Sequence, residues 1–196
     1  MDGLTRGLAI VAAAVSGAVG AGVQPHAVRA ISADASSTSL PRSCLRLTPL
    51  RHGRIEAVIR RGRLLRSVTL RRVGGSRIYG CDSTGARDEG RLWCNVETAR
   101  LRSGRVTDPR LGLLCTTRRH QHVASAWITP MRRTRLLVVL DGRRRDRYRV
   151  VGTLPVRVAV THGIAYDRAS AVFVFAEYGA RGRLVRKARI VARVAG

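Results

Sequence analysis

Short runs of apolar residues alternate along this chain with glycines at intervals of roughly ten residues, a spacing typical of strands and turns in a sandwich or barrel. In the run 154–161, every second position carries Leu or Val. This is the period of a strand with one buried face, and it places Arg157 and Thr161 on the solvent side. Residues 171–178 (AVFVFAEY) are apolar on both faces, so we expect a central strand there. The pattern predicts a chain built mainly of β-strands.

The rest of the chain after the first quarter continues this pattern. Further strands are predicted at 55–59, 64–73, 77–81, 92–97, 123–129 and 136–140. The last segment, 184–194, alternates apolar with basic residues, and the turn at 179–182 should join it to the preceding strand as a hairpin. An amphipathic helix is the alternative there, but the β-branched residues favour a strand. A helix is also the alternative at 55–65, where Gly62 would cost about 1 kcal/mol.

These elements predict an all-β fold, a β-sandwich-like domain that is immunoglobulin-like or similar, over residues 44–196. The length suits either one domain or two small, tightly joined β lobes, 44–116 and 121–196, with the seam at 116–121. Residues 31–43 are rich in serine and are predicted to be a linker before the folded domain.

The N-terminal segment 1–30 differs in composition from the rest. A short head with Arg6 precedes 8–23, an uncharged run of small apolar residues, and Val28 and Ala30 occupy the two positions that a signal peptidase recognises. This predicts a signal peptide cleaved after Ala30. An uncleaved membrane anchor is the alternative, although the run is shorter than the ~20 residues of a spanning helix. We therefore expect a secreted or extracytoplasmic protein, anchored to the membrane if the segment is retained.

Positive charge dominates the composition, with 37 Lys and Arg residues against 12 Asp and Glu and a net charge of +25. GC-rich codons account for part of the arginine excess but not for the scarcity of acidic residues. Such a surface attracts polyanions whether or not a site exists. The residues expected to bind them are Arg60, Arg61, Arg63, Arg143, Arg144, Arg145, Arg147 and Arg149. The alternative interpretation is a set of solvated loops and strand faces.

The expected partners are acidic polymers or an anionic membrane surface, bound without specificity. Aromatic residues make up only 4% of the chain, and Trp127, Phe173 and Phe175 lie in strand-like runs where core packing explains them. A platform for single-stranded nucleic acid needs aromatic residues interleaved with arginines. Tyr148 fits this pattern, but it alternates onto the opposite face from Arg147. Sequence-specific recognition of nucleic acid is therefore not expected.

The four cysteines indicate disulfide bonds. In an exported chain an even number predicts two bridges, and four cysteines allow three connectivities. We prefer Cys81 with Cys94, which closes the polar loop between them, and Cys44 with Cys115, which ties the start of the domain to the end of its first half. A zinc site is the alternative, but the chain has no C-x-x-C pair, so no metal is predicted.

Motifs for chemistry are otherwise scarce. The sequence has no serine nucleophile elbow, zinc-protease helix or phosphate-cradling loop. His120 and His122 would share one face of a strand, as two metal ligands do, but the adjacent arginines at 118–119 disfavour a cation there. No cofactor is expected. A non-enzymatic protein is favoured, and a secreted hydrolase whose site is assembled only in space is the alternative.

Several short motifs carry a resemblance to known sequences. They are Tyr79-Gly80-Cys81-Asp82, Trp93-Cys94, 108–111 (DPRL) with Cys115, 124–130 (ASAWITP), 154–159 (LPVRVA) and 194–196 (VAG). Through them, residues 79–196 resemble a group of uncharacterised exported, β-rich proteins of high-GC bacteria. The resemblance implies secretion and β structure, and it implies no activity because none is assigned to the group. We therefore expect a secreted or envelope-associated β-rich module with an interaction or structural role, whose arginines hold polyanions.

Overall fold

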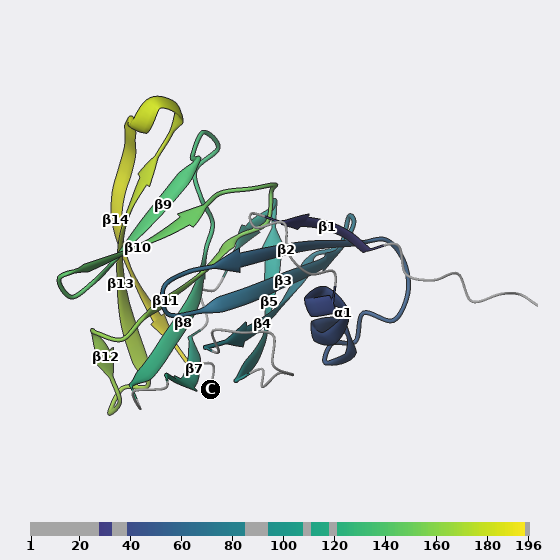
Figure 1. The fold of residues 1–196 in the computed structure, drawn as a ribbon, viewed down its shortest axis with the longest axis horizontal. Helices are drawn as coiled ribbons and strands as arrows, with labels where there is room; N and C mark the ends of the chain where they lie inside the picture. The colour runs from purple at the N-terminus through teal and green to yellow at the C-terminus, as the bar shows by residue number, and fades with distance from the viewer. Residues whose placement is uncertain (1–27, 33–38, 85–93, 108–110, 118–120, 195–196) are drawn as a thin grey trace, which may run out of the picture.

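The computed structural model of this chain describes residues 28–32, 39–84, 94–107, 111–117 and 121–194. Most of these residues lie in strands, which form three curled sheets packed in layers (Figure 1). The prediction of an all-β, sandwich-like fold is confirmed. Within the described residues there is also one α-helix, α1 (Ser39–Arg46), and one short 3-10 turn at Ala180–Gly182.

The first sheet contains six strands in sequence order. They are β1 (Val28–Ser32), β2 (Ile55–Arg61), β3 (Arg66–Arg72), β4 (Arg77–Ser83), β5 (Asn95–Arg102) and β6 (Arg105–Val106). β1 runs parallel to β2, and the other neighbours are antiparallel. Helix α1 covers one face of this sheet, where Cys44 packs with Ile55 and Val68 in one hydrophobic cluster.

The remaining strands form two sheets. The second has the order β11–β8–β7, and the third has the order β10–β9–β13, with β12 and β14 also paired to β13. Their bounds are β7 (Gly112–Thr116), β8 (His122–Ile128), β9 (Leu136–Asp141), β10 (Arg144–Arg149), β11 (Val156–Val160), β12 (Ile164–Ala165), β13 (Ser170–Tyr178) and β14 (Leu184–Arg193). The predicted central strand 171–178 is thus β13, and the segment 184–194 forms a strand and not a helix.

The largest hydrophobic cluster lies between the second and third sheets. It joins Phe173 and Phe175 of β13 to Val156 and Val158 of β11 and to Leu137 of β9, all of them buried. The third sheet therefore turns one face toward the core, and its other face lies on the outside of the layers (Figure 1).

A buried ion pair joins the first sheet to the second. Asp82 of β4 accepts hydrogen bonds from Arg157 Nε and Ser125 Oγ, each at 2.9 Å. The Arg157 guanidinium lies 4.4 Å from the ring centroid of Trp127. The alternation in 154–161 predicts Arg157 on the solvent side. This is wrong, because a second layer covers that face of β11 and Asp82 supplies the countercharge.

Two disulfides are present, as predicted, but the predicted pairing is wrong. Cys44 is bonded to Cys81, and Cys94 to Cys115, with Cα–Cα separations of 5.8 and 5.0 Å. Cys44 and Cys81 share the cluster beneath α1, whereas Cys94 and Cys115 meet in a separate cluster. Each cysteine is therefore bonded to the cysteine in its own hydrophobic cluster. The expected Cys81–Cys94 pair rested on closeness in sequence, which does not decide the pairing.

Two of the boundaries expected from the sequence fall within regular elements. The segment 31–43, predicted as a linker, contains the start of α1, and the cleavage point expected after Ala30 lies within β1. The seam expected at 116–121 lies in the connection of β7 with β8, which pair with each other. The apolar run 8–23 lies outside the described residues.

Two features of the structure bear on location. The two disulfides fit an oxidising, extracytoplasmic compartment. Among the described residues, no helix has the length and the apolar character that a membrane span requires.

Candidate polyanion-binding surface

Most carboxylates in the described part of the chain point inward. Asp82, Asp141, Asp146 and Glu177 are each at most 3% exposed, and each accepts hydrogen bonds from neighbouring strands or loops. Among the other described carboxylates, Asp167 alone is largely exposed. The surface is therefore more positive than the composition indicates, because the acidic side chains that could neutralise it are used inside the fold.

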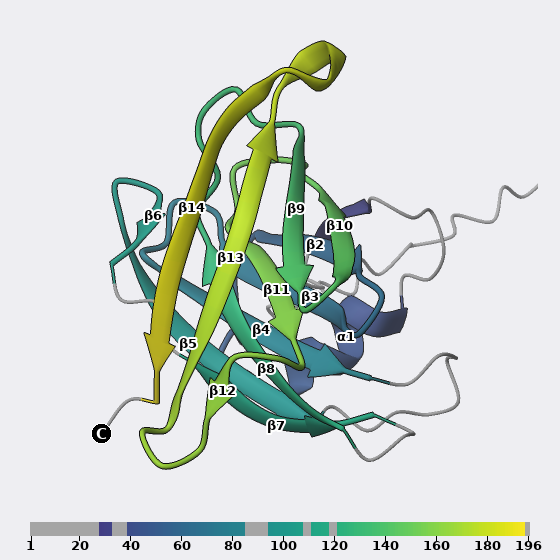
Figure 2. The same ribbon diagram turned by 90° about the vertical axis from the view of Figure 1, so that its left-hand side faces the viewer.

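The outward face of the third sheet, which Figure 2 shows turned toward the viewer, combines basic and aliphatic residues in register. Across β10, β9, β13 and β14, one row contains Arg145, Leu140, Val174 and Arg189, and the next contains Arg147, Val138, Ala176 and Lys187. Residues that pair directly in a sheet point to the same side. In both rows, the two outer strands carry cations and the two central strands carry aliphatic groups.

We call this surface the outer sheet face. Its residues are Arg145, Arg147 and Arg149 of β10, Leu136, Val138 and Leu140 of β9, Val172, Val174, Ala176 and Tyr178 of β13, and Lys187, Arg189 and Val191 of β14, with no acidic residue among them. Leu140, Val174 and Val191 are 41%, 38% and 41% exposed. Because neighbouring strands lie about 4.8 Å apart, the β10 and β14 cations form two rows about 14 Å apart.

The structure brings only part of the predicted arginine set to this face. Arg145, Arg147 and Arg149 lie on it, and Arg61, Arg143 and Arg144 are exposed at nearby strand ends. Lys187 and Arg189 were not in the predicted set. Only the pairing of β13 with both β9 and β14 shows that they share a face with the β10 arginines.

Arg60 does not contribute to any exposed surface. It is only 2% exposed. Its guanidinium donates to the backbone carbonyls of Leu154 and Pro155, each at 3.1 Å, and of Val151 at 3.3 Å. Burial lowers its pKa to about 10, against the opposing effect of Glu56, so the group is still a cation at neutral pH. The prediction that Arg60 binds polyanions is wrong, because this side chain holds the connection between β10 and β11.

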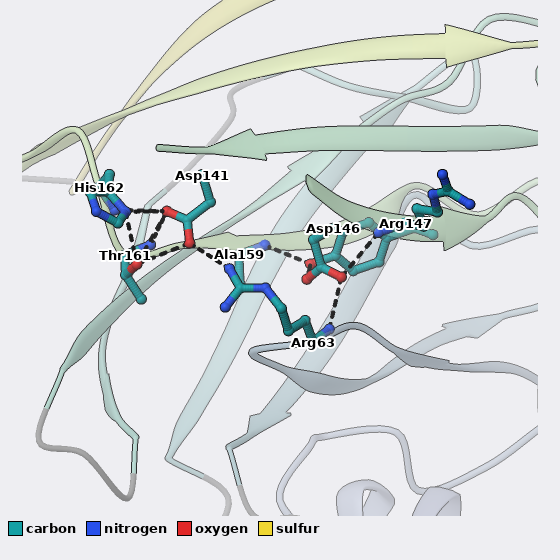
Figure 3. A network of polar contacts seen from close by, with 8 residues as sticks. Arg63, Asp141, Asp146, Arg147, Ala159, Thr161 and His162 are labelled. Carbon is teal, nitrogen blue, oxygen red and sulfur yellow. Dashed lines mark hydrogen bonds and ion pairs between the residues drawn. The ribbon is translucent and has the colours of Figure 1, made fainter. Parts of the chain in front are cut away.

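Arg63 is already engaged within the protein. Its guanidinium lies 2.7 Å from Asp141 Oδ2, and its backbone N–H donates to Asp146 Oδ1 at 2.8 Å (Figure 3). These contacts tie the turn between β2 and β3 to β9 and β10. Arg63 therefore offers less free charge to a ligand than the exposed arginines of β10 do.

Tyr148 fixes the strand that carries those arginines. Its hydroxyl donates to Asp146 Oδ2 at 2.8 Å and accepts from the backbone N–H of Ala159 at 3.2 Å. Burial, together with the charge and hydrogen bond of Asp146, raises the pKa of Tyr148 well above its ordinary value, so the phenol stays protonated. Its ring is buried, and Arg147 is exposed on the opposite face, as the predicted alternation of faces requires.

A histidine that the sequence motifs did not single out lies beside these contacts (Figure 3). His162 Nδ1 lies 3.0 Å from Asp141 Oδ1, and the backbone N–H groups of Thr161 and His162 donate to the same oxygen at 2.7 and 2.9 Å. Burial raises the pKa of Asp141, but the hydrogen bonds from His162 and Thr161 more than offset it, so the pKa lies below its ordinary value.

This pair resembles two members of a catalytic triad in its geometry. A buried carboxylate that orients an exposed imidazole is the arrangement of a catalytic dyad. The ring of His162 lies against Gly142, and the hydroxyl of Thr161 bonds Asp141 at 2.9 Å. Across the described ranges, no serine, threonine or cysteine hydrogen-bonds His162 Nε2, so a nucleophile that completes the dyad is not seen there.

No metal centre is found in the described part of the chain, where no group of His, Cys, Asp and Glu is placed to hold an ion. His122 is exposed and packs edge-on against Tyr166, with 5.8 Å between ring centroids, and His120 lies outside the described residues. The zinc alternative for the cysteines is ruled out by the two disulfides, which leave no free thiol.

Comparison of this chain with protein-family models, curated proteins and solved structures finds no match. The functional interpretation therefore rests on the geometry and charge of the described residues. Two features stand out: most of the described carboxylates are buried, and cations lie in rows on the outer sheet face.

Proposed function

We propose that this protein is a secreted or envelope-associated binding module that holds linear polyanions on its outer sheet face without sequence specificity. The observation that carries the proposal is the register of the third sheet, in which Arg145 and Arg189 end one row and Arg147 and Lys187 end the next. With no carboxylate on this face, these cations have no neutralising neighbour there.

Polyanion binding of this kind has a defined physical signature. Each phosphate that a cation neutralises releases condensed counterions, so log K falls with log salt by about 0.9 per contact for double-stranded DNA. The aliphatic side chains that β9 and β13 contribute to these two rows offer no hydrogen bonds to bases. Affinity should therefore depend strongly on salt and weakly on sequence.

The test uses two variants of the disulfide-bonded protein that remove equal charge from different places. One replaces Arg145, Arg147, Lys187 and Arg189 with serine. The control replaces Arg42, Arg51, Arg54 and Arg77, which are exposed on α1, the loop after it and β4. If the four face cations contact phosphates, the face variant should flatten the salt dependence of binding to a DNA duplex by about 3 to 4 units. The control variant should keep most of the salt dependence of the wild type.

Equal loss in both variants would show that charge acts diffusely and would contradict a defined face. Two duplexes of unrelated sequence test whether affinity depends on sequence. Poly-glutamate tests whether the face also binds a polyanion that is not a nucleic acid. Vesicles containing anionic lipid provide a further arm. If vesicles bind and soluble polymers do not, a membrane surface replaces the polymer as the partner.

A secreted hydrolase is the second candidate, and the contact of His162 with Asp141 favours it. In such an enzyme His162 would act as a general base on water. Turnover of a simple aryl ester that is lost in a His162→Gln variant, while polyanion binding is retained, would support this candidate. Under our proposal, the variant and the wild type show the same background rate.

A further inference from the structure

A cleft of about 770 Å³ lies where three connections of the fold converge. Its lining comes from Ser103 and Gly104 between β5 and β6 with Arg105 of β6, from 129–132, 134 and 135 after β8, and from 150–154 between β10 and β11. No residue of the outer sheet face lines it. The cleft is therefore a second site, separate from the surface of the proposed function.

The lining is cationic at some positions and aliphatic at others. Arg105, Arg132 and Arg135 contribute three guanidinium groups, and all three residues are exposed. Val150 and Leu154 belong to its apolar part. None of the lining residues is acidic. Arginine binds phosphate and carboxylate groups through paired N–H donors, so this combination suits an anion with an apolar portion.

The wall at 129–135 is held by a buried carboxylate. Glu177 accepts hydrogen bonds from the backbone N–H of Met131 at 2.7 Å and from the hydroxyl of Thr134. Arg186 donates to the same carboxylate at 2.7 Å and to the carbonyl of Thr129 at 3.3 Å. Both ends of this wall are thus held by the ion pair between the buried Glu177 and the partly exposed Arg186.

A second wall, 150–154, is held by a buried cation. The guanidinium of Arg60 donates hydrogen bonds to the carbonyls of Val151, Leu154 and Pro155, which belong to the connection between β10 and β11. Burying a charge costs free energy unless its partners compensate for the lost water. Here the compensation comes from the backbone of the cleft wall itself, so the wall is preorganised before any ligand arrives.

From this geometry we propose that the cleft binds a small amphiphilic anion, an alkyl phosphate in chemical class. Three arginines favour a dianionic head over a single carboxylate, and the aliphatic lining accommodates a short chain. The volume lies within the range of about 300 to 1,000 Å³ that is usual for small-molecule sites. The head group is shared by lipid phosphates and by soluble phosphomonoesters, and the apolar portion distinguishes them.

Calorimetry with octyl phosphate below its micellar concentration tests the proposal on the disulfide-bonded protein. Octyl glucoside supplies the chain without the charge, and inorganic phosphate supplies the charge without the chain. We expect saturable binding of one octyl phosphate per protein, with both reference compounds at least about tenfold weaker, because each lacks one part of the recognised group. Equal binding of inorganic phosphate would assign the site to soluble phosphate, and equal binding of octyl glucoside would overturn the proposal.

Variants locate the site. Arg132→Gln with Arg135→Gln removes two exposed guanidinium groups and should weaken octyl phosphate binding by about tenfold or more. The same protein should keep the salt dependence of polyanion binding, while the fourfold serine variant of the outer sheet face should keep octyl phosphate binding. Amide chemical shifts at 131–135 and 150–154 provide a second readout that a change in folding alone would not confine to these segments. An unchanged affinity in the Gln variant would overturn the assignment.

Discussion

Individual charged side chains in this protein have two distinct roles. Those that are buried hold parts of the fold together, as Asp82 does with Arg157 and Glu177 with Arg186. Those that are exposed, such as Arg147, leave a charge available to a ligand. The same residue type therefore contributes to stability in one place and is accessible to a ligand in another, and substitutions can separate the two roles.

Replacing Arg157 with Met should strongly destabilise the protein. The change leaves Asp82 buried without its cation and removes the contact with Trp127. Breaking a buried pair from one side costs about 3 to 5 kcal/mol. The matched control is Arg147→Met on the exposed side of β10, which should change the free energy of unfolding by about 0.5 kcal/mol or less. Urea denaturation with intact disulfides measures both, and similar values for the two variants would contradict the structural role of Arg157.

The Asp141 carboxylate should make stability depend on pH in the acid range. Its pKa in the folded protein lies below the ordinary value of 3.8. Folding therefore favours the charged form. The resulting stabilisation is present above pH 3.8 and is lost as the pH falls through the folded pKa. We expect Asp141→Asn to be less stable than the wild type at pH 6, with the difference shrinking below pH 3.8. Thermal unfolding between pH 2 and 7 checks this, and a difference that is constant across the range would refute it.

At the scale of strands and helices, the two-residue period located most elements, because it depends only on which positions are apolar. It could not reveal that Arg157 is buried, since the covering layer comes from strands distant in sequence. The sequence hides the register of the strands for the same reason, so only strand pairing shows that Lys187 and Arg189 lie on the outer sheet face. Helix α1 at 39–46 was missed because the segment is short, serine-rich and contains Pro41.

The disulfide pairing can be checked directly. Arginines lie between every two successive cysteines, so trypsin can separate all four. Mass spectrometry of the unreduced digest should find peptides linking Cys44 to Cys81 and Cys94 to Cys115. Removing either bridge by paired Cys→Ala changes should cost about 2 to 4 kcal/mol. A peptide linking Cys81 to Cys94 would refute the arrangement in the structure.

For the whole molecule, the net charge of +25 has two opposite effects: it attracts polyanions, and it destabilises the folded state through repulsion between like charges. Like charges on a compact surface repel one another, and salt screens this repulsion over about 10 Å at 0.1 M. Neighbouring arginines on one side of β10 lie about 7 Å apart, within that distance. The conditions that weaken polyanion binding should therefore stabilise the fold.

Two measurements test this balance. The melting temperature of the wild type should rise when salt is raised from about 10 to about 150 mM, because the screening length falls. The melting temperature of the fourfold serine variant of the outer sheet face should rise less with salt, since this variant lacks four of the cations that repel one another. If the variant and the wild type respond identically to salt, repulsion at this face does not limit stability.

The outer sheet face and helix α1 lie at opposite ends of the molecule (Figure 1). Attachment through one end gives every bound copy the same orientation. A layer of this protein on a polyanion would therefore have two unlike sides, with the cations of β10 and β14 turned inward and α1 turned toward the medium. Whatever approaches such a coat first meets α1, the helix that the Cys44–Cys81 bridge fastens to the first sheet.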